Sequence, residues 1–191
     1  VDSVADCIKL GKQMDVITAG ERDGKIAEGL KYGNTPLQYQ PQFIKGKTLV
    51  LTTTNGTRLL HMALAENAQS IITGSFCNLT AVSNYLIAQN KNVILACAAW
   101  KDRVNIEDTL FAGAVISRIK NHFNQNCDAS QIAETLYQQA GDDLFGFMRD
   151  HNASHYHRLM DYGLEEDIRF CLTIDNANQL ILYKEGRLIA G

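Results

Sequence analysis

Residues 48–59 read Thr-Leu-Val-Leu-Thr-Thr-Thr-Asn-Gly-Thr-Arg-Leu. The β-branched and apolar run at residues 48–51 predicts a buried strand, and leucines spaced as in a helix follow it. The threonine-rich turn therefore leads into a helix start, where the first backbone N–H groups have no internal partner. Gly56 allows a ligand to approach the backbone closely, and Arg58 supplies a planar fork that matches a phosphate edge. This combination predicts an anion-binding site.

A simpler interpretation is that Thr54 or Asn55 only caps the helix and that Arg58 is solvated, because such caps are common. Three successive threonines are more polar than a cap requires, and the chain repeats the same strand, turn and helix pattern later. We therefore favour anion binding for this stretch.

The composition suits one globular domain over residues 1–191, with 46% hydrophobic residues and a net charge of −3. The chain has no basic run, which argues against nucleic-acid binding. It has no apolar run as long as a membrane span. The five cysteines are widely spaced and lack a Cys-x-x-Cys pair, so we expect reduced, mostly buried thiols in a cytoplasmic protein.

Strands and helices alternate along the first two thirds of the chain. This order predicts an α/β fold of three layers, α/β/α, with a largely parallel or mixed sheet. A helix-rich subregion follows at residues 128–175, and the helical C-terminal third ends in a predicted β-hairpin. The expected strands are residues 15–19, 48–51, 70–73 and 92–97.

Polar side chains follow several of these strands. Because ligands of a parallel sheet gather at the carboxyl ends of its strands, we expect these side chains to meet. The candidates are Glu21, Arg22, Thr53, Thr54, Asn55, Thr57, Arg58, Ser75, Asn78, Glu107 and Asp108.

Glu107 and Asp108 open the predicted helix of residues 107–120. Acidic residues there also suit the helix dipole, which is an alternative explanation of the pair. Oxygen ligands accompanied by an anion-binding turn nevertheless suit Mg²⁺, which takes one or two carboxylates with substrate oxygens and water. His151, His155 and His157 cluster in one later stretch but fit known zinc signatures only loosely, so we expect surface or packing histidines rather than a zinc site.

Several of these motifs occur together, and in order, in one known family. They are Ala19-Gly20-Glu21-Arg22, Tyr32-Gly33-Asn34-Thr35-Pro36, residues 52–58, Gly74-Ser75-Phe76-Cys77-Asn78, Ile106-Glu107-Asp108, Phe111-Ala112-Gly113-Ala114 and residues 163–172 leading to Asp175. With them the chain resembles the ComB family, the 2-phosphosulfolactate phosphatases, over nearly its whole length.

The resemblance implies a Mg²⁺-dependent phosphatase that converts 2-phosphosulfolactate to sulfolactate, a step of coenzyme M biosynthesis in methanogens. Asn55, Gly56, Thr57 and Arg58 would hold the phosphate, with Thr54 and Ser75 as further substrate ligands. Glu107 and Asp108, with Glu21, would bind the metal or orient water, and Arg22, Asn34 and Asn78 would position the sulfonate or carboxylate. We thus expect Glu107, Asp108 and Arg58 to be catalytic.

The chain departs from the family pattern in two places. The family's upstream Asp-x-x-Arg-Ala-x-Thr-Thr strand and turn is absent, and Ala98-Ala99-Trp100-Lys101 stands where relatives often have a glycine-containing turn. The alternative hypothesis is therefore a non-catalytic anion-binding module or an inactive fragment of such an enzyme. The expected partner is a small anionic phosphoester, and the helical C-terminal third could supply a homodimer surface.

Overall fold

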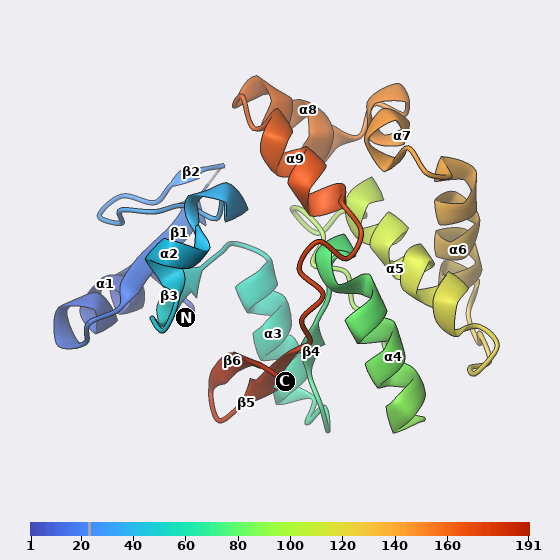
Figure 1. The fold of residues 1–191 in the computed structure, drawn as a ribbon, viewed down its shortest axis with the longest axis horizontal. Coiled ribbons are helices and arrows are strands. Elements are labelled where there is room, and N and C mark those ends of the chain that lie inside the picture. Colours follow the sequence, from blue (N-terminus) through green and yellow to red (C-terminus); the bar gives the residue numbers. More distant parts are fainter. Residues whose placement is uncertain (23) are drawn as a thin grey trace. The chain divides into compact units, whose positions relative to one another are not determined.

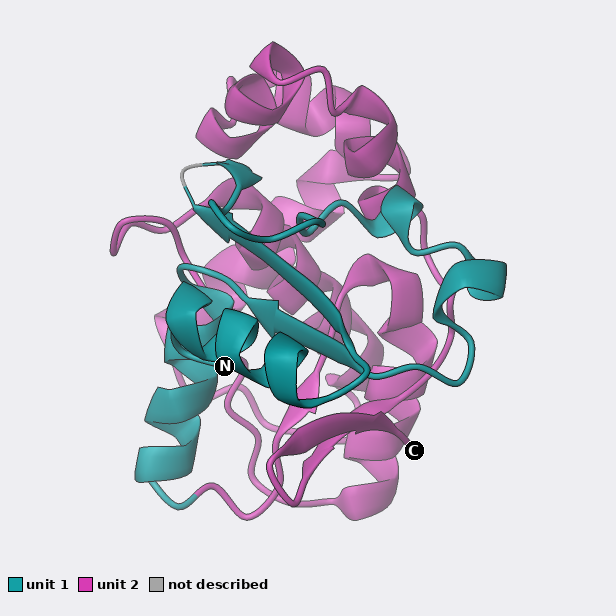
Figure 2. Cartoon of the chain, turned by 90° about the vertical axis from the view of Figure 1, so that its left-hand side faces the viewer, with its two compact units in different colours: residues 1–67 teal, residues 68–191 magenta. Residues whose placement is uncertain are grey.

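The computed structural model describes residues 1–22 and 24–191 (Figure 1). Asp23, in the charged turn after the first strand, lies outside the described residues. The chain divides into two compact units, residues 1–67 and residues 68–191, coloured separately in Figure 2. The single domain expected over residues 1–191 stays a prediction.

Unit 1 is built on a small mixed sheet with strand order β2-β1-β3. Its helices and strands are α1 (Val4–Gln13), β1 (Ile17–Arg22), β2 (Lys25–Ile26), the 3₁₀ helix η1 (Pro36–Gln38), α2 (Pro41–Ile44), β3 (Leu49–Thr52) and α3 (Gly56–Ala65). β1 and β3 are parallel, with Gly20 opposite Thr52, whereas β1 and β2 form an antiparallel hairpin.

Helix α1 packs on this sheet through Cys7, which is fully buried. The Cys7 thiol lies 3.2 Å from the Val50 carbonyl oxygen and 3.6 Å from that of Ala19, so the helix touches both parallel strands. Ser3 caps α1 by accepting a hydrogen bond from the Asp6 amide at 3.0 Å. The cap and the buried thiol fix the helix on the two strands that lead to the candidate site.

Unit 2 is mostly helical. Its elements are β4 (Ile72–Thr73), the 3₁₀ helix η2 (Phe76–Asn78), α4 (Leu79–Gln89), α5 (Ile106–Ile119), α6 (Asp128–Ala140), α7 (Leu144–Asp150), α8 (Ser154–Asp161), α9 (Glu165–Leu172), β5 (Ile181–Lys184) and β6 (Arg187–Ala190). The predicted α/β class, the helical C-terminal part and its final hairpin are confirmed. The second sheet, β4-β5-β6, is antiparallel throughout. Parallel pairing between named strands is therefore confined to β1 and β3, and the predicted three-layer stacking stays a prediction because the two sheets belong to different units.

Helix α5 is the centre of the core of unit 2. Leu110, Ala114 and Val115 are completely buried there, and they pack in one cluster with side chains of α4 and α7. On another face, α5 meets α6 at Gly113, where the backbones approach too closely for any larger residue. This packing fixes the first turn of α5, which carries Glu107 and Asp108.

The strand expected at residues 92–97 is wrong, because the structure assigns no strand there. Val93 and Leu95 pack against the core of unit 2, whereas Ile94 is 91% exposed. The residues alternate as in a strand, but in the described chain they join no hydrogen-bonded ladder of either sheet. Burial that alternates along a segment therefore does not show that a partner strand is present.

All five cysteines are free thiols, but the expectation that most are buried is wrong. Cys7 is buried and Cys77 is half-buried, whereas the other three are exposed. Among residues 1–22 and 24–191, no helix is both long enough and apolar enough to cross a bilayer.

Asp175 ties the segment before β5 to the start of α4. Its carboxylate accepts hydrogen bonds from the Thr80 amide at 2.7 Å and from the Thr80 hydroxyl, and Arg118 lies 3.5 Å away. Burial raises the pKa of Asp175, but the Thr80 hydrogen bonds and the Arg118 charge lower it more, so the net pKa is below its ordinary value of 3.8. The ionised carboxylate therefore stabilises the fold.

We expect Asp175→Asn to lower the free energy of unfolding by about 1–2 kcal/mol near neutral pH. Because the folded pKa is depressed, the difference should be fully present above the unfolded-state pKa and should vanish as the pH falls through the folded pKa. Urea unfolding of both proteins between pH 7 and pH 2 measures this. Asparagine tolerates the left-handed backbone of residue 175, so a constant difference at all pH values would contradict the role of the charge.

Candidate active-site residues

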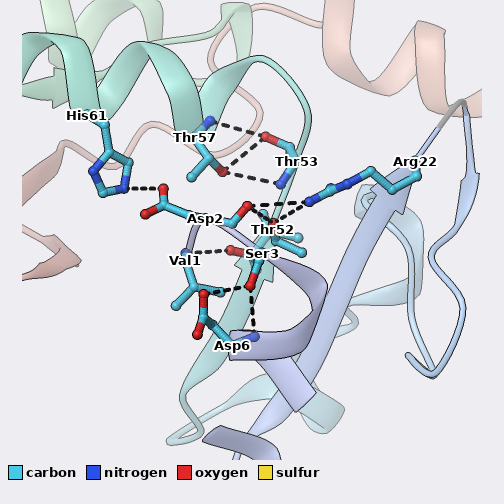
Figure 3. Close-up of polar contacts among 10 residues, drawn as sticks. Val1, Asp2, Ser3, Asp6, Arg22, Thr52, Thr53, Thr57 and His61 are labelled. Atoms are coloured by element: carbon cyan, nitrogen blue, oxygen red, sulfur yellow. Dashed lines mark hydrogen bonds and ion pairs between the residues drawn. The ribbon is translucent and has the colours of Figure 1, made fainter. Parts of the chain in front are cut away.

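In unit 1 the parallel pairing brings the predicted anion-binding residues together. Since Gly20 lies opposite Thr52, the end of β1 and the turn after β3 meet at the same edge of the sheet. Arg22 extends across this edge, and its Nη2 donates to the Thr52 hydroxyl at 3.0 Å (Figure 3). Thr52 itself is fully buried. Glu21, beside Arg22, accepts a hydrogen bond from the Gly24 amide and so closes the β1–β2 turn.

Two threonines form reciprocal hydrogen bonds at the start of α3. The Thr57 amide donates to the Thr53 hydroxyl at 3.3 Å, and the Thr53 amide donates to the Thr57 hydroxyl at 3.2 Å (Figure 3). This reciprocal pair does the work of a helix cap. Asn55, the residue at the cap position, makes no side-chain cap hydrogen bond. The side-chain amide of Asn55 is therefore not used to cap the helix, and its neighbours Thr54 and Gly56 are exposed.

Among the described residues, the neighbours of the Arg22 guanidinium are neutral oxygens: the carbonyl oxygens of Glu21, at 2.6 Å, and Asp2, at 3.5 Å, and the Thr52 hydroxyl. In the described chain no carboxylate lies within ion-pair distance of this guanidinium. A cation held only by neutral oxygens keeps its attraction for an anion.

Asn34 and Asn78 have different environments. Asn34 is exposed and comes two residues after Tyr32, which bridges in parallel to Ala19 of β1. Asn78 is 6% exposed, and both ends of its amide bond to the protein backbone, accepting from Ser75 and donating to Thr73 and Gln179. In this structure Asn78 thus joins β4 to the segment before β5, and its polar atoms are occupied.

In unit 2 the first turn of α5 presents Glu107 and Asp108. Asn105 caps the helix by accepting from the Asp108 amide at 3.0 Å. The Asp108 carboxylate in turn accepts from the Ala99 amide at 2.9 Å and from the Asn105 side chain at 3.3 Å. Two hydrogen-bond donors therefore hold one carboxylate oxygen of Asp108, and this fixes the orientation of the side chain.

Glu107 is largely buried, with 19% of its side chain exposed. One oxygen lies 2.8 Å from His155 Nδ1. The other, Oε2, is buried and has no hydrogen-bond partner among the described residues. A buried carboxylate oxygen without a partner is costly, and such an oxygen suits a cation ligand.

The turn carrying Ser75 lies beside α5. A Cβ at Gly74 would come within 2.7 Å of the Phe111 ring, and Phe111 follows Glu107 by one helical turn. Unit 2 thus brings the exposed Ser75 near the face of α5 that carries Glu107.

The loop that presents the Ala99 amide to Asp108 has an unusual backbone. Ala99, Lys101 and Asp102 all have positive φ angles, of 61°, 51° and 58°, which costs a non-glycine residue about 1–2 kcal/mol.

Glycine at position 99 should relieve this strain and raise the free energy of unfolding by about 1 kcal/mol or less. Ala98→Gly is the matched control, because residue 98 is not among the described positive-φ residues. It should destabilise by about 0.5–1 kcal/mol. Thermal unfolding of both variants gives the comparison, and an equal loss in both would contradict the strained backbone at Ala99.

The three predicted surface or packing histidines have three different partners. His151 stacks on Phe147, with ring centroids 3.9 Å apart, and His157 lies 3.2 Å from the Asn152 side chain. His155 instead contacts Glu107. The sequence interpretation missed this role and those of Asn105 and Arg158. Asn105 had a signal, an asparagine three residues before an acid at a helix start, whereas the His155 contact joins residues 48 positions apart.

Comparisons with known proteins agree with the resemblance seen in the sequence. The model of the family described as 2-phosphosulpholactate phosphatase matches residues 1–186. A probable 2-phosphosulfolactate phosphatase of Caldanaerobacter subterraneus is 35% identical over 190 residues, covering 97% of this chain and 77% of the relative. Proteins of the same name are 37% identical in Thermotoga petrophila (92% and 73% covered) and 38% identical in Thermotoga maritima (86% and 69% covered). The chain belongs to the 2-phosphosulpholactate phosphatase family.

Proposed function

We propose that the chain is a Mg²⁺-dependent phosphatase that hydrolyses 2-phosphosulfolactate, or a similar small anionic phosphoester, to sulfolactate and phosphate. Family membership and the names of its relatives support a phosphoric monoester hydrolase with that substrate. The observation that supports the proposal is the parallel β1–β3 register, which sets Arg22 against Thr52 at the end of β3, directly before the threonine-rich turn that leads into α3.

The phosphate would bind at the start of α3. Backbone N–H groups of a first helical turn attract anions, and Gly56 carries no side chain that would keep phosphate oxygens away from them. Arg22 and Arg58 add guanidinium groups from two elements of unit 1. In phosphoryl transfer most of the catalysis comes from positioning and from stabilising negative charge, which is what these groups provide.

Glu107 and Asp108 fit Mg²⁺ by their chemistry. Nowhere in residues 1–22 and 24–191 do three or more His, Cys, Asp or Glu side chains gather as a metal site, but Mg²⁺ needs only one or two carboxylates with substrate oxygens and water. The unpartnered Oε2 of Glu107 is an available hard ligand, and Asp108 is held by two donors. Glu21 is a weaker candidate, because one of its oxygens bonds to Gly24. When bound, the metal would neutralise charge on the transferring phosphoryl group.

The roles of the chain's own residues follow from these contacts. Asp108, fixed by Ala99 and Asn105, would orient the metal or the attacking water. Glu107 would be held by His155, which contributes to its orientation as outer partners of metal ligands do. A cytoplasmic location, a homodimer and a place in coenzyme M biosynthesis remain predictions from the sequence.

Phosphate release from 2-phosphosulfolactate in the presence of Mg²⁺ tests the proposal. Arg58→Ala and Asp108→Asn should each lower kcat/KM by about 10²-fold or more, whereas Arg149→Ala, on the exposed face of α7 and paired with Asp150, should not. Calorimetric titration with phosphate, with and without Mg²⁺, accompanies the assay. Phosphate binding by a wild-type protein that releases no product would instead support a non-catalytic anion-binding module.

A further inference from the structure

Arg158, on helix α8, lies next to His155, the residue that contacts Glu107. The guanidinium carbon of Arg158 lies 4.4 Å from the centroid of the Trp100 ring, and its Nη2 lies 3.0 Å from His155 Nδ1. All four residues belong to unit 2. The cluster of Trp100, Glu107, His155 and Arg158 was not among the candidate sites identified from the sequence.

The cluster has one hydrogen-bond acceptor too few for its donors. His155 Nδ1 faces both Glu107 Oε1, at 2.8 Å, and Arg158 Nη2, at 3.0 Å. If Nδ1 carries a proton, it donates to Glu107 and cannot accept from Arg158. If Nδ1 carries none, it accepts from Arg158 and turns a lone pair towards the Glu107 carboxylate. The first arrangement is favoured, because a largely buried carboxylate facing a lone pair would be repelled. It leaves Arg158 Nη2 without His155 as its acceptor.

Arg169, in the same unit, shows what a satisfied stacked arginine looks like. Its guanidinium lies 3.7 Å from the Phe145 ring centroid, and Nε and Nη2 donate to one oxygen of Glu165 at 2.9 and 2.7 Å. Arg158 has the same aromatic support, but its Nε is buried without a hydrogen-bond partner in the described chain. The described residues also place no carboxylate within ion-pair distance of it.

We propose that Arg158 binds one of the two anionic groups that 2-phosphosulfolactate carries besides its phosphate, the sulfonate or the carboxylate, and so determines specificity for substrates with that group. The proposal rests on the proposed function for the identity of that substrate. Stacking on Trp100 fixes the plane of the guanidinium, and a fixed plane presents its N–H groups as a fork that matches two oxygens of a sulfonate or carboxylate. Lys101, 4.6 Å from the same ring, adds positive charge beside it.

The test compares wild type, Arg158→Met and Arg158→Lys on three substrates. These are 2-phosphosulfolactate, 2-phospholactate, which lacks the sulfonate, and 2-sulfoethyl phosphate, which lacks the carboxylate. Methionine can still cover Trp100 but donates no hydrogen bond. We expect Arg158→Met to lower kcat/KM about 10²-fold for 2-phosphosulfolactate and for the one analogue that keeps the group bound by Arg158. The other analogue should be turned over unchanged, and this difference identifies the group.

An equal loss on all three substrates would show that Arg158 only supports the fold, and no loss on any would show that it binds nothing; either result overturns the proposal. Arg149→Met is the control for removing an arginine from a neighbouring helix, and melting temperatures check folding. If wild type hydrolyses none of the substrates, the proposed function fails separately. Calorimetric titration with sulfolactate then decides, because binding by wild type and not by Arg158→Met supports the proposal, whereas equal or absent binding overturns it.

Discussion

Glutamine in place of Glu107 should lower kcat for phosphate release from 2-phosphosulfolactate by about 10²- to 10³-fold. The substitution keeps the shape of the side chain but replaces the carboxylate by an amide, which cannot serve as a charged metal ligand. The Oε2 of this carboxylate is buried and has no hydrogen-bond partner among the described residues. It should also raise the Mg²⁺ concentration that gives half-maximal rate. Initial rates measured over a range of Mg²⁺ concentrations report both effects.

Asp128→Asn is the matched control, because Asp128 also stands in the first turn of a helix, α6, and is exposed. It should reproduce any general effect of removing an acid from a helix start, which is about 0.3–1 kcal/mol in stability, and leave the rate unchanged. Wild-type rates and an unshifted Mg²⁺ requirement in Glu107→Gln would remove Glu107 from the catalytic residues.

Alanine in place of Gly113 should destabilise unit 2 by about 3 kcal/mol. A Cβ at this position would lie 2.0 Å from the Ala133 carbonyl oxygen and 2.6 Å from its carbon. These are backbone atoms of α6, so α5 and α6 must move apart. The gain in helix propensity, about 1 kcal/mol, does not offset this. We expect the melting temperature to fall by roughly 6–12 °C.

Gly56→Ala provides the contrast in unit 1, since its Cβ would meet only the Thr53 hydroxyl, at 3.3 Å. This variant should melt within a few degrees of wild type but bind phosphate more weakly, because the methyl group covers the first turn of α3. If Gly113→Ala melted like wild type, the close α5–α6 packing would be wrong.

Much of the local structure was predictable, because it depends on residues close together in the sequence. The Thr-rich turn after an apolar strand predicted the start of α3. The β-hairpin expected at the end of the helical C-terminal third is present as β5–β6. In each case the signal and its consequence lie within a few residues of one another.

The remaining features depend on contacts between distant segments. The segment at residues 92–97 has the alternation of a strand, but a ladder requires a partner that its own sequence cannot specify. Asn78 has the residue type of a ligand, yet its amide bonds to Thr73 and Gln179. The Glu107–His155–Arg158 cluster forms only because α8 packs near the start of α5. Propensity and spacing do not contain this information.

The most direct test of the central claim is phosphate release from 2-phosphosulfolactate by the wild-type chain, first after treatment with EDTA and then as Mg²⁺ is added back. The account predicts almost no phosphate without the metal and a saturable rate that returns with it. Full activity in EDTA, or no phosphate at any Mg²⁺ concentration, would contradict it.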